Sequence, residues 1–457
     1  MIWNLIKWLF SLHGGKTIYG SSRFLTGFHK WRILNPFNKG FVLDGKNKIT
    51  LKRSRQHCIA IAPTGAGKTT KLILPNVLRL DGPSVVITDP SGEILQNSRG
   101  YLRSKGYQIK VLDFTNPTNS HKYNPLSRAS GSQIDKLSAI LVGSAYQDSK
   151  GEAFWNNSAE HIITLIIRAV KGLPEEKQNL GEVYRILNKF GHKQEEVNRL
   201  MSEKLDERSF EMFAGFLSQD DKVLNSILST AKTALSKFGD ENIDLITASE
   251  TLHFESIRSE RVAIILIIPE FDTRYFSFIL SIFYSQLFFH CLKTEINNDT
   301  RDVFYLLDEF GNSGSFGNNF SSVITTARKK KISILAVLQD FEMLVEVFGK
   351  SAASTIFNGG FNSKIYYPGL SLQSCEELSR TLGKRTLSYK EAGYNDKRTG
   401  SIPDRDRDLG RELLTADEIR TLKSNRAICI SGSELPILLK TTPWYKNRKL
   451  KRRAKIQ

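Results

Sequence analysis

The chain contains few of the residues that build covalent or metal-bound scaffolds. Its four cysteines lie far apart and form no CxxC pair; they are Cys58, Cys291, Cys375 and Cys429. This spacing argues against a disulfide framework or a zinc site and favours reduced thiols in a cytosolic protein. The composition, 40% hydrophobic and 25% charged over 457 residues, indicates a globular protein of two or three domains.

Apolar runs long enough to cross a membrane are also missing. The first twelve residues, Met1–Leu12, are apolar except for three polar positions that would form one stripe of a helix. They are too few to span a bilayer and no small-residue cleavage site follows, so we expect an interfacial helix or, alternatively, a helix docked on protein. The apolar run 276–292 includes serines, a glutamine and a histidine, which favours a buried helix. We therefore expect no transmembrane helix.

Acidic residues are nearly absent from the two ends of the chain. Residues 1–60 contain eleven Lys and Arg and one acid, and residues 440–457 contain eight Lys and Arg and no acid. The net charge of +18 is therefore carried by the ends, and residues 61–439 are net neutral. Basic ends of this kind suit an anionic membrane surface, a nucleic-acid backbone or plain solvation, and all three remain open.

Eight runs rich in β-branched residues predict strands, and the helical segments between them predict a mostly parallel sheet covered on both faces. The predicted strands are His57–Ile61, Ser84–Asp89, Gln108–Asp113, Arg261–Pro269, Val303–Asp308, Ile332–Leu338, Ser363–Tyr367 and Arg426–Ser431. The charged stretch Ser388–Glu412 has little apolar content and predicts a mobile loop.

The segment from about residue 133 to residue 248, before the predicted strand Arg261–Pro269, has a different pattern. It shows almost no β-branched alternation, and its apolar residues recur with the period of a helix. The predicted helices are Lys136–Val142, Ala153–Val170, Leu180–Phe190, Glu195–Leu205, Arg208–Phe216 and Val223–Phe238. We therefore predict an all-α domain inserted into an α/β core. The expected divisions are a basic N-terminal segment at 1–45, the core at 46–127 and 249–440, the insertion at 128–248, and a basic C-terminal tail at 441–457.

The first predicted strand leads into a candidate phosphate-binding loop. The sequence APTGAGKTT follows the strand and opens a helix, which is the strand–loop–helix order that such a loop requires. Glycines let backbone N–H groups curl around phosphate oxygens, the lysine reaches the β- and γ-phosphates, and the threonine hydroxyl is a magnesium ligand. The candidate nucleotide-binding residues are Ala62, Pro63, Thr64, Gly65, Ala66, Gly67, Lys68, Thr69 and Thr70. Ala62 stands where the usual pattern has its first glycine.

The second half of a nucleoside triphosphatase site lies almost 240 residues further on. The buried run VFYLL is followed by Asp308 and Glu309, at the strand end where ligands bind in parallel sheets. We expect Asp308 to hold magnesium, together with Thr69, and Glu309 to polarise the attacking water. The two halves together predict ATP hydrolysis with Lys68 and Glu309 as catalytic residues.

Three further residues are candidates for supporting roles. Gln339 ends the strand Ile332–Leu338 and is expected to sense the γ-phosphate or orient water. Arg328 is expected to stabilise transition-state charge, most readily on a neighbouring subunit's ATP, with a solvated basic turn as the alternative. Asp89, at the end of SVVITD, has two open interpretations: a place in the magnesium shell or a subunit contact.

An ordered series of motifs over nearly the whole chain resembles the coupling ATPases of type IV secretion and conjugative DNA transfer, the TraG/VirD-like family. Besides the two halves of the site, the series comprises YGSSRF at Tyr19–Phe24, DPSGEIL after Thr88, HKYNPLS at His121–Ser127, FW at Phe154–Trp155, TLGKRT at Thr381–Thr386 and RELLTADEIRTL at Arg411–Leu422. The resemblance implies a RecA-like P-loop motor domain with an inserted all-α domain facing the cytoplasm. It also implies ATP and Mg²⁺ as cofactors and a homo-hexamer when active. The implied partners are DNA, single-stranded or relaxase-bound, a relaxase and the channel proteins.

Two departures from the family pattern affect the interpretation. Most relatives have a lysine in the DPxGE element where this chain has Ser91, so no role carries over to that position. Most relatives also begin with transmembrane helices, whereas this chain shows none. We therefore expect a peripheral location at the inner face of the membrane, with the anchor replaced by Met1–Leu12 or supplied by a partner.

Three other functions are compatible with a nucleoside triphosphatase of this architecture. A cytosolic DNA translocase of the FtsK/HerA type is disfavoured by the helical insertion and the RELLTADEI element. An ATP-switched adaptor that recruits protein substrates is disfavoured because both Glu309 and Arg328 are present. A protein exporter built on the same ring is the third alternative. Any DNA contact in the neutral core is expected to be local, on loops such as Lys329–Lys331 or Ser388–Glu412.

Overall fold

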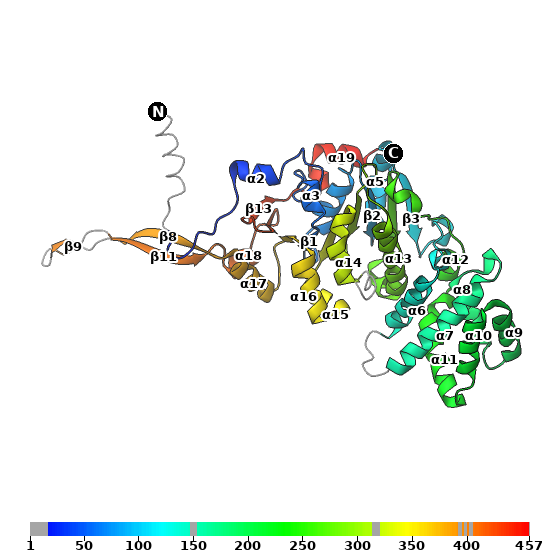
Figure 1. Cartoon of the computed structure of the whole chain (residues 1–457). Helices are drawn as coiled ribbons and strands as arrows, with labels where there is room; N and C mark the ends of the chain where they lie inside the picture. Colours follow the sequence, from blue (N-terminus) through cyan, green and yellow to red (C-terminus); the bar gives the residue numbers. More distant parts are fainter. Residues whose placement is uncertain are drawn as a thin grey trace.

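The structure is a computed structural model that describes residues 17–146, 153–312, 320–391, 395–396, 400–401 and 405–456. In this part of the chain nine strands form one sheet, in the order β13-β12-β7-β1-β6-β5-β2-β4-β3 (Figure 1). The strands are β1 (Cys58–Ile61), β2 (Ser84–Asp89), β3 (Gln108–Asp113), β4 (Val262–Ile267), β5 (Val303–Leu307), β6 (Ile332–Leu338), β7 (Ser363–Tyr366), β12 (Arg426–Ser431) and β13 (Ile437–Lys440). Strands β1 to β7 pair in parallel, and β12 and β13 pair antiparallel at one edge.

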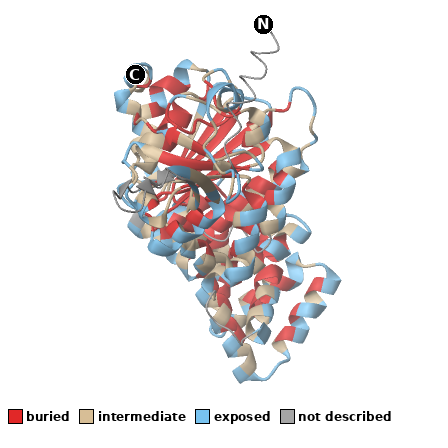
Figure 2. Ribbon diagram, turned by 90° about the vertical axis from the view of Figure 1, so that its left-hand side faces the viewer, coloured by how far each residue is buried: buried red, intermediate tan, exposed pale blue. Residues whose placement is uncertain are grey.

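The central strands are buried on both faces because their sequences are almost wholly apolar. Every residue of β1, β2, β5 and β6 is buried, as expected for parallel strands covered by helices on both sides (Figure 2). All eight predicted strands are present, with bounds that differ from the prediction by at most two residues. The four-residue strand β13 was not predicted, because it is too short to show a period.

Helices cover the two faces of the sheet and create two separate cores. One face carries α2 (Gly27–Ile33), α3 (Leu51–Ser54), α4 (Leu74–Val77), α5 (Glu93–Ser104) and α19 (Arg448–Ala454). The opposite face carries α13 (Thr273–Lys293), α14 (Phe320–Ala327), α15 (Glu342–Phe348), α16 (Lys350–Thr355), α17 (Leu372–Leu382) and α18 (Ala416–Arg420). The mostly parallel, doubly covered sheet confirms the predicted α/β fold class.

The predicted all-α insertion lies between β3 and β4 and forms the lower lobe of the molecule (Figure 1). Its helices are α6 (Ser132–Ala145), α7 (Ala153–Lys171), α8 (Leu180–Lys189), α9 (Gln194–Lys204), α10 (Glu207–Leu217), α11 (Asp221–Leu235) and α12 (Glu241–Thr247). Side chains such as Ile163, Leu187 and Ala231 are fully buried among them, and this core is continuous with the one under the sheet. The six predicted helices are confirmed.

Helix α13 belongs to both lobes. Phe288 stacks on Tyr305 of β5 with ring centroids 4.4 Å apart, while Phe278 packs against Phe238 of the insertion at 5.5 Å. Among the described residues, α13 is the one helix whose length and apolar composition would allow it to cross a membrane, and most of its apolar window is buried in the molecule. This matches the prediction of a buried helix in run 276–292.

The prediction of a mobile loop at Ser388–Glu412 was wrong in part. Strands β8 (Lys384–Glu391) and β11 (Arg405–Glu412) pair antiparallel along their whole length and project from the body as a two-stranded ribbon (Figure 1). Two short strands, β9 (Asn395–Asp396) and β10 (Gly400–Ser401), pair further along the hairpin. The strands were missed because the ribbon has no apolar face; in β11 basic and acidic residues alternate over 405–408 instead.

Helix α2, near the start of the described residues, and the C-terminal helix α19 lie on the side of the molecule away from the helical insertion (Figure 1). Residues near Ser21 pair with Arg385 on the free edge of β8, and Lys30 donates its ammonium to the carbonyl of Leu438 at 2.9 Å. The amide of Thr442 donates to the carbonyl of Asp44. The two basic ends of the chain are therefore packed together. The interfacial helix predicted at Met1–Leu12 lies outside the described residues.

His57, the residue before β1, is buried and forms hydrogen bonds to β6 and α14. Its Nδ1 accepts from the amide of Ile334 at 3.1 Å, and its Nε2 lies 2.9 Å from the carbonyl of Ile324, to which it donates as the neutral tautomer. Burial, reinforced by the positive charge of Arg328, lowers the pKa of His57 to about 4. The ring must be neutral in the folded protein, because a protonated Nδ1 would lose its acceptor role.

We predict that His57 makes the fold acid-sensitive. The unfolded chain binds a proton at this group below pH 6.5 and the folded chain only below about pH 4, so stability is lost as the pH falls through this window. The loss amounts to about 3 kcal/mol over the whole window. His57→Gln keeps one acceptor and one donor without titrating. Urea unfolding at pH 7 and pH 5 should therefore show a smaller acid penalty for the variant than for the natural chain. Equal penalties would contradict the assignment.

Candidate functional site

The phosphate loop connects β1 to the helix that starts at Thr69, as predicted. Gly65 and Gly67 have φ values of +79° and +83°, a left-handed conformation that side chains at these positions would strain. Ala62, at the first position of the motif, is fully buried and donates its amide to the carbonyl of Leu338 on β6. Its methyl group is accommodated in the core, which explains why glycine is not required there.

The two halves of the predicted site meet at the carboxyl edge of the sheet. The Lys68 ammonium forms an ion pair with the Glu309 carboxylate, and the Thr69 hydroxyl donates to Asp308 Oδ2 at 2.5 Å. Both acids are almost fully buried. The amide of Asp308 donates to Thr88 Oγ1 at 2.8 Å, which fixes the end of β5 against β2. Residues 241 and 239 positions apart in sequence are thus in direct contact.

The chemistry of the acid pair suits a hard cation. Burial raises the pKa of Asp308 to about 7; the Thr69 hydroxyl and Lys68 oppose the shift, and the charges of Glu309 and Asp89 add to it. Asp308 Oδ1 is buried with no hydrogen-bond partner among the described residues. A divalent cation beside this oxygen would stabilise the carboxylate, and Mg²⁺ prefers one or two protein oxygens with waters and phosphates completing its shell. The residues present therefore fit a magnesium ion.

Gln339 links the phosphate loop to the acids. It follows β6, which lies between β1 and β5 in the sheet. The Thr64 hydroxyl donates to Gln339 Oε1 at 3.1 Å, and Gln339 Nε2 donates to Glu309 Oε1 at 3.2 Å. A movement of the phosphate loop at Thr64 would therefore shift the Gln339 side chain and its hydrogen bond to Glu309.

Arg328 lies apart from the site of its own chain. It begins the turn before β6, whereas Gln339 follows that strand, so the two residues sit at opposite edges of the sheet, roughly 20 Å apart along seven strand residues. Its side chain is exposed. A contact between Arg328 and a nucleotide bound by the same subunit is excluded by this position.

Asp89 has a structural partner. Its Oδ2 accepts from the amide of Leu95, in the first turn of α5, at 2.8 Å, and Gly92, with φ +73°, is the residue that precedes this helix. Burial raises the pKa of Asp89, and the backbone amides at the start of α5 lower it. The charge of Asp89 contributes to the raised pKa of Asp308, and Asp89 Oδ1 is buried without a hydrogen-bond partner among the described residues, so both interpretations of Asp89 stay predictions. Ser91 is exposed and accepts only from the amide of Glu93.

Lys71 and Ser424 form a contact that sequence analysis missed. The Lys71 ammonium donates to the carbonyl of Ala66 in the phosphate loop at 2.6 Å and to the carbonyl of Ser424 at 2.9 Å. It thereby connects the loop to the segment before β12. No local pattern marks a contact between residues so far apart in sequence, although the position of Lys71 directly after the TT of the motif was a usable signal.

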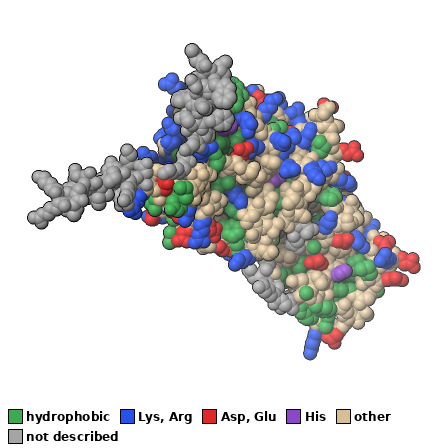
Figure 3. Space-filling view, turned by 60° about the vertical axis from the view of Figure 1, so that its left-hand side comes forward, with side chains coloured by type: hydrophobic (Ala, Val, Ile, Leu, Met, Phe, Trp, Pro, Cys, Tyr) green, Lys and Arg blue, Asp and Glu red, His purple; other side chains and the backbone are tan. Residues whose placement is uncertain are grey.

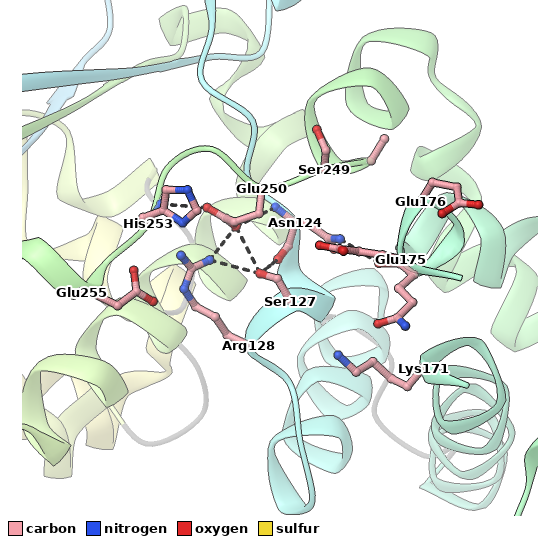
Figure 4. Close-up of a pocket in the computed structure, with 12 residues that line it drawn as sticks. Asn124, Ser127, Arg128, Lys171, Glu175, Glu176, Ser249, Glu250, His253 and Glu255 are labelled. Atoms are coloured by element: carbon pink, nitrogen blue, oxygen red, sulfur yellow. Dashed lines mark hydrogen bonds and ion pairs between the residues drawn. The ribbon is translucent and has the colours of Figure 1, made fainter. Parts of the chain in front are cut away.

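A cavity of about 770 Å³ lies at the junction of the two lobes (Figure 4). Glu250 is at its centre. Its carboxylate accepts from Arg128 at 2.5 Å and from Ser127 and the amide of Asn124 on the incoming connector. The other oxygen accepts from the amides of residues 252 and 253 on the outgoing connector. Arg128 also stacks on the ring of Phe254 at 4.0 Å. One carboxylate therefore ties together both chain segments that join the insertion to the core.

The fold and site define a class of protein: a RecA-like P-loop domain with a helical insertion. The phosphate loop on β1, the acids on β5 and the strand β6 between them are arranged as in P-loop motors. The chain belongs to the family described as Type IV secretory system Conjugative DNA transfer, whose profile matches residues 24–457. The resemblance inferred from the motifs is thus confirmed.

The chain is also similar in sequence to known proteins. The chain is 21% identical to Protein VirD4 of Agrobacterium fabrum over 88% of its length, and 21% identical to the conjugal transfer protein TraG of Escherichia coli over 82%. It spans about 60% of the length of these relatives. Among solved structures, the bacterial conjugative coupling protein TrwBdeltaN70 matches with a TM-score of 0.68, 15% identity and coverage of 94% of this chain and 97% of that one. VirB4 of Thermoanaerobacter pseudethanolicus matches with a TM-score of 0.53 and 13% identity, covering 91% of this chain and 98% of that one.

Proposed function

We propose that this chain is an ATP-driven coupling protein that recruits DNA and moves it to a type IV secretion channel. The observation that carries the proposal is the convergence of Lys68, Thr69, Asp308 and Glu309 at one edge of the sheet in a member of the conjugative transfer family. Structures of TrwB in complex with ADP and Mg²⁺ and with a non-hydrolysable ATP analogue support ATP and Mg²⁺ as the cofactors.

Each residue of the site has a proposed role. Lys68 and the amides of loop 62–70 hold the phosphates, and Thr69 and Asp308 hold the magnesium, which neutralises phosphate charge when bound. Glu309 accepts the proton of the attacking water. Phosphate competes for Lys68, so nucleotide binding frees the Glu309 carboxylate from its ion pair. Gln339, already hydrogen-bonded to Glu309, orients that carboxylate toward the water.

The domain division predicted from sequence supports a division of labour. We propose that the core at 46–127 and 249–440 turns over ATP, and that the insertion at 128–248 faces the DNA and a relaxase. The described parts of the two proposed terminal segments, residues 17–45 and 441–456, pack against the core and not against the insertion. A homo-hexamer and a peripheral location at the inner face of the membrane, through Met1–Leu12 or a membrane partner, complete the proposal.

The experiment that tests this function is ATP turnover by the purified chain with and without DNA. We expect single- or double-stranded DNA to stimulate turnover by the natural chain and not by Lys68→Ala. Stimulation by a secreted protein instead of DNA would favour the adaptor or exporter alternatives. A cytosolic translocase of the FtsK/HerA type remains open until a relaxase or a channel protein is shown to bind.

A mixing experiment tests the proposed role of Arg328. Because Arg328 cannot reach the nucleotide of its own chain, we propose that it completes the site of a neighbouring subunit. Arg328→Ala and Glu309→Gln should each be inactive alone. Mixed, they should recover part of the activity, because a subunit with an intact Glu309 then meets a neighbour with an intact Arg328. Lack of recovery, despite mixed oligomers detected by mass, would contradict a role between subunits.

A further inference from the structure

Three aromatic side chains protrude from the side of the molecule where residues 30–44 contact residues 438–442. Phe28 and Trp31 on α2 are 71% and 51% exposed, and their rings stack with centroids 6.0 Å apart. Phe37, in the turn after α2, is 81% exposed. A buried core takes most aromatic residues of this chain, so three exposed ones within ten residues require an explanation.

The turn that carries Phe37 is held rigidly in this outward position. Asn35 Oδ1 accepts from the amides of Phe37 and Asn38, at 2.9 and 3.0 Å. The Asn38 amide group donates to the carbonyl of Lys48 at 2.9 Å. Ile33, which ends α2, and Leu34, which follows it, are buried in the core on the face of the sheet that carries α2. Phe37 is therefore presented to the outside by a hydrogen-bonded scaffold.

The same scaffold joins α2 to the basic C-terminal helix. Arg79 donates to the carbonyl of Pro36 at 3.4 Å, and its own carbonyl accepts from the Lys48 ammonium at 3.0 Å. Arg453 of α19 donates to the carbonyl of Leu78 at 2.7 Å and lies over the ring of Tyr101. Helix α2, turn 35–39 and α19 thus form one surface, called the terminal face below. In Figure 3 the upper part of the molecule, where α19 lies, is rich in Lys and Arg side chains.

The terminal face carries an excess of positive charge that its own acids do not balance. Helix α19 and its flanks expose Arg448, Lys449, Lys451, Arg452 and Lys455. The charge of Arg453 lowers the pKa of Lys449, and burial with the charges of Arg79, Arg453 and Lys449 lowers the pKa of Lys48 to about 8. Of the two acids near this group, Asp81 already pairs with Lys105 and Arg261, and Asp44 accepts hydrogen bonds from the backbone of Lys46 and Asn47. Anions are therefore attracted to this face.

We propose that the terminal face docks on the headgroup layer of an anionic lipid bilayer. Aromatic side chains that protrude beside clustered Lys and Arg match the layered structure of a bilayer surface, in which rings enter the interface and cations stay with the phosphates. The occupant is a membrane and not a second terminal face, because two surfaces of the same sign repel. The inference rests on the peripheral location proposed above, but it adds a folded docking surface that is independent of Met1–Leu12.

Flotation of the full-length chain with vesicles tests the inference. The vesicles are phosphatidylcholine alone or mixed with phosphatidylglycerol. We expect binding to the mixed vesicles only, weakened by salt. Trp31→Ala/Phe37→Ala should reduce the affinity about tenfold. Lys449→Glu/Arg452→Glu should reduce it by at least about tenfold, since each basic side chain near an anionic leaflet contributes on the order of a tenfold factor or somewhat less.

Matched variants at the other end of the molecule serve as controls. Phe154→Ala removes an exposed aromatic ring of the insertion, and Lys177→Glu/Lys222→Glu reverses two exposed charges there. Both should bind vesicles as the natural chain does. All variants should keep their ATP turnover, which separates a failure of this inference from a failure of the proposed motor function.

Three outcomes would overturn the inference. The first is vesicle binding unchanged in both terminal-face variants. The second is complete loss of binding on deletion of residues 1–15 together with no effect of the terminal-face substitutions, which would assign the membrane contact to the N-terminal segment alone. The third is a loss of DNA binding in the same variants with vesicle binding intact, which would make the face a nucleic-acid surface.

Discussion

Lys68→Ala should reduce ATP turnover by roughly 10³-fold and weaken nucleotide binding. Lys68 contributes the positive charge that the loop places beside Glu309. The neighbouring Lys71 cannot replace it, because Lys71 donates to the carbonyls of Ala66 and Ser424.

Glu309→Gln should lower turnover by a factor of about 10² to 10⁴ while nucleotide binding is retained. A glutamine keeps the oxygen that accepts from Gln339 and removes only the base.

The two variants should differ in nucleotide binding, which Lys68→Ala weakens and Glu309→Gln retains. Steady-state turnover together with titration of a fluorescent ATP analogue separates binding from chemistry. Lys350→Ala and Glu346→Gln, exposed residues of α16 and α15, are controls with the same chemical changes and should behave as the natural chain. Normal turnover in Glu309→Gln would remove Glu309 as the base, and unaltered ATP binding in Lys68→Ala would remove Lys68 as the phosphate ligand.

Glu250→Ala should destabilise the protein by about 3 to 5 kcal/mol, more than any other single acid of the junction. The change leaves Arg128, whose side chain is 16% exposed, without its counter-charge. It also leaves the amides of Leu252 and His253 without their side-chain acceptor. Chemical unfolding measures the loss. Glu176→Ala, an exposed acid of the same cavity, should change stability by less than about 0.5 kcal/mol.

A double-mutant cycle keeps this prediction testable if the alanine variant does not fold. Glu250→Gln retains an oxygen for the backbone amides, and Arg128→Met removes the buried cation. Because each single change leaves one charge unpaired, the double variant should be more stable than the sum of the two single losses predicts. Additive losses would show that the pair is not coupled, and the junction would then be held by other contacts, such as the Lys171 ammonium on the carbonyl of Leu126.

Most of the fold was predictable because its signals are local. Strands such as Ser84–Asp89 and Ile332–Leu338 are continuous β-branched runs, and the structure reproduces these two without a shift. The phosphate loop is a contiguous motif, so Lys68 and Thr69 were identified directly. Asp308 and Glu309 were placed with them because carboxyl ends of parallel strands share one edge.

The parts that were missed depend on contacts between distant residues. Glu250 meets Arg128 across 122 positions, and nothing near either residue in sequence marks the pair. In the ribbon of β8 and β11, strand β11 alternates basic and acidic residues over 405–408, which was interpreted as loop composition because no apolar face accompanies it. The terminal face arises only because Arg79 contacts the turn after α2 and Arg453 of α19 contacts the neighbouring carbonyl of Leu78, although the two basic ends were recognised separately.

The central claim is that ATP turnover by this chain moves DNA, and the most direct measurement is displacement of a roadblock. A streptavidin–biotin block or a third strand on a DNA duplex should be released by the natural chain with ATP and Mg²⁺. Release should fail with a non-hydrolysable analogue and with Glu309→Gln. If the natural chain hydrolyses ATP in the presence of DNA but never displaces the block, the account of a DNA motor is contradicted and an ATP-switched adaptor takes its place.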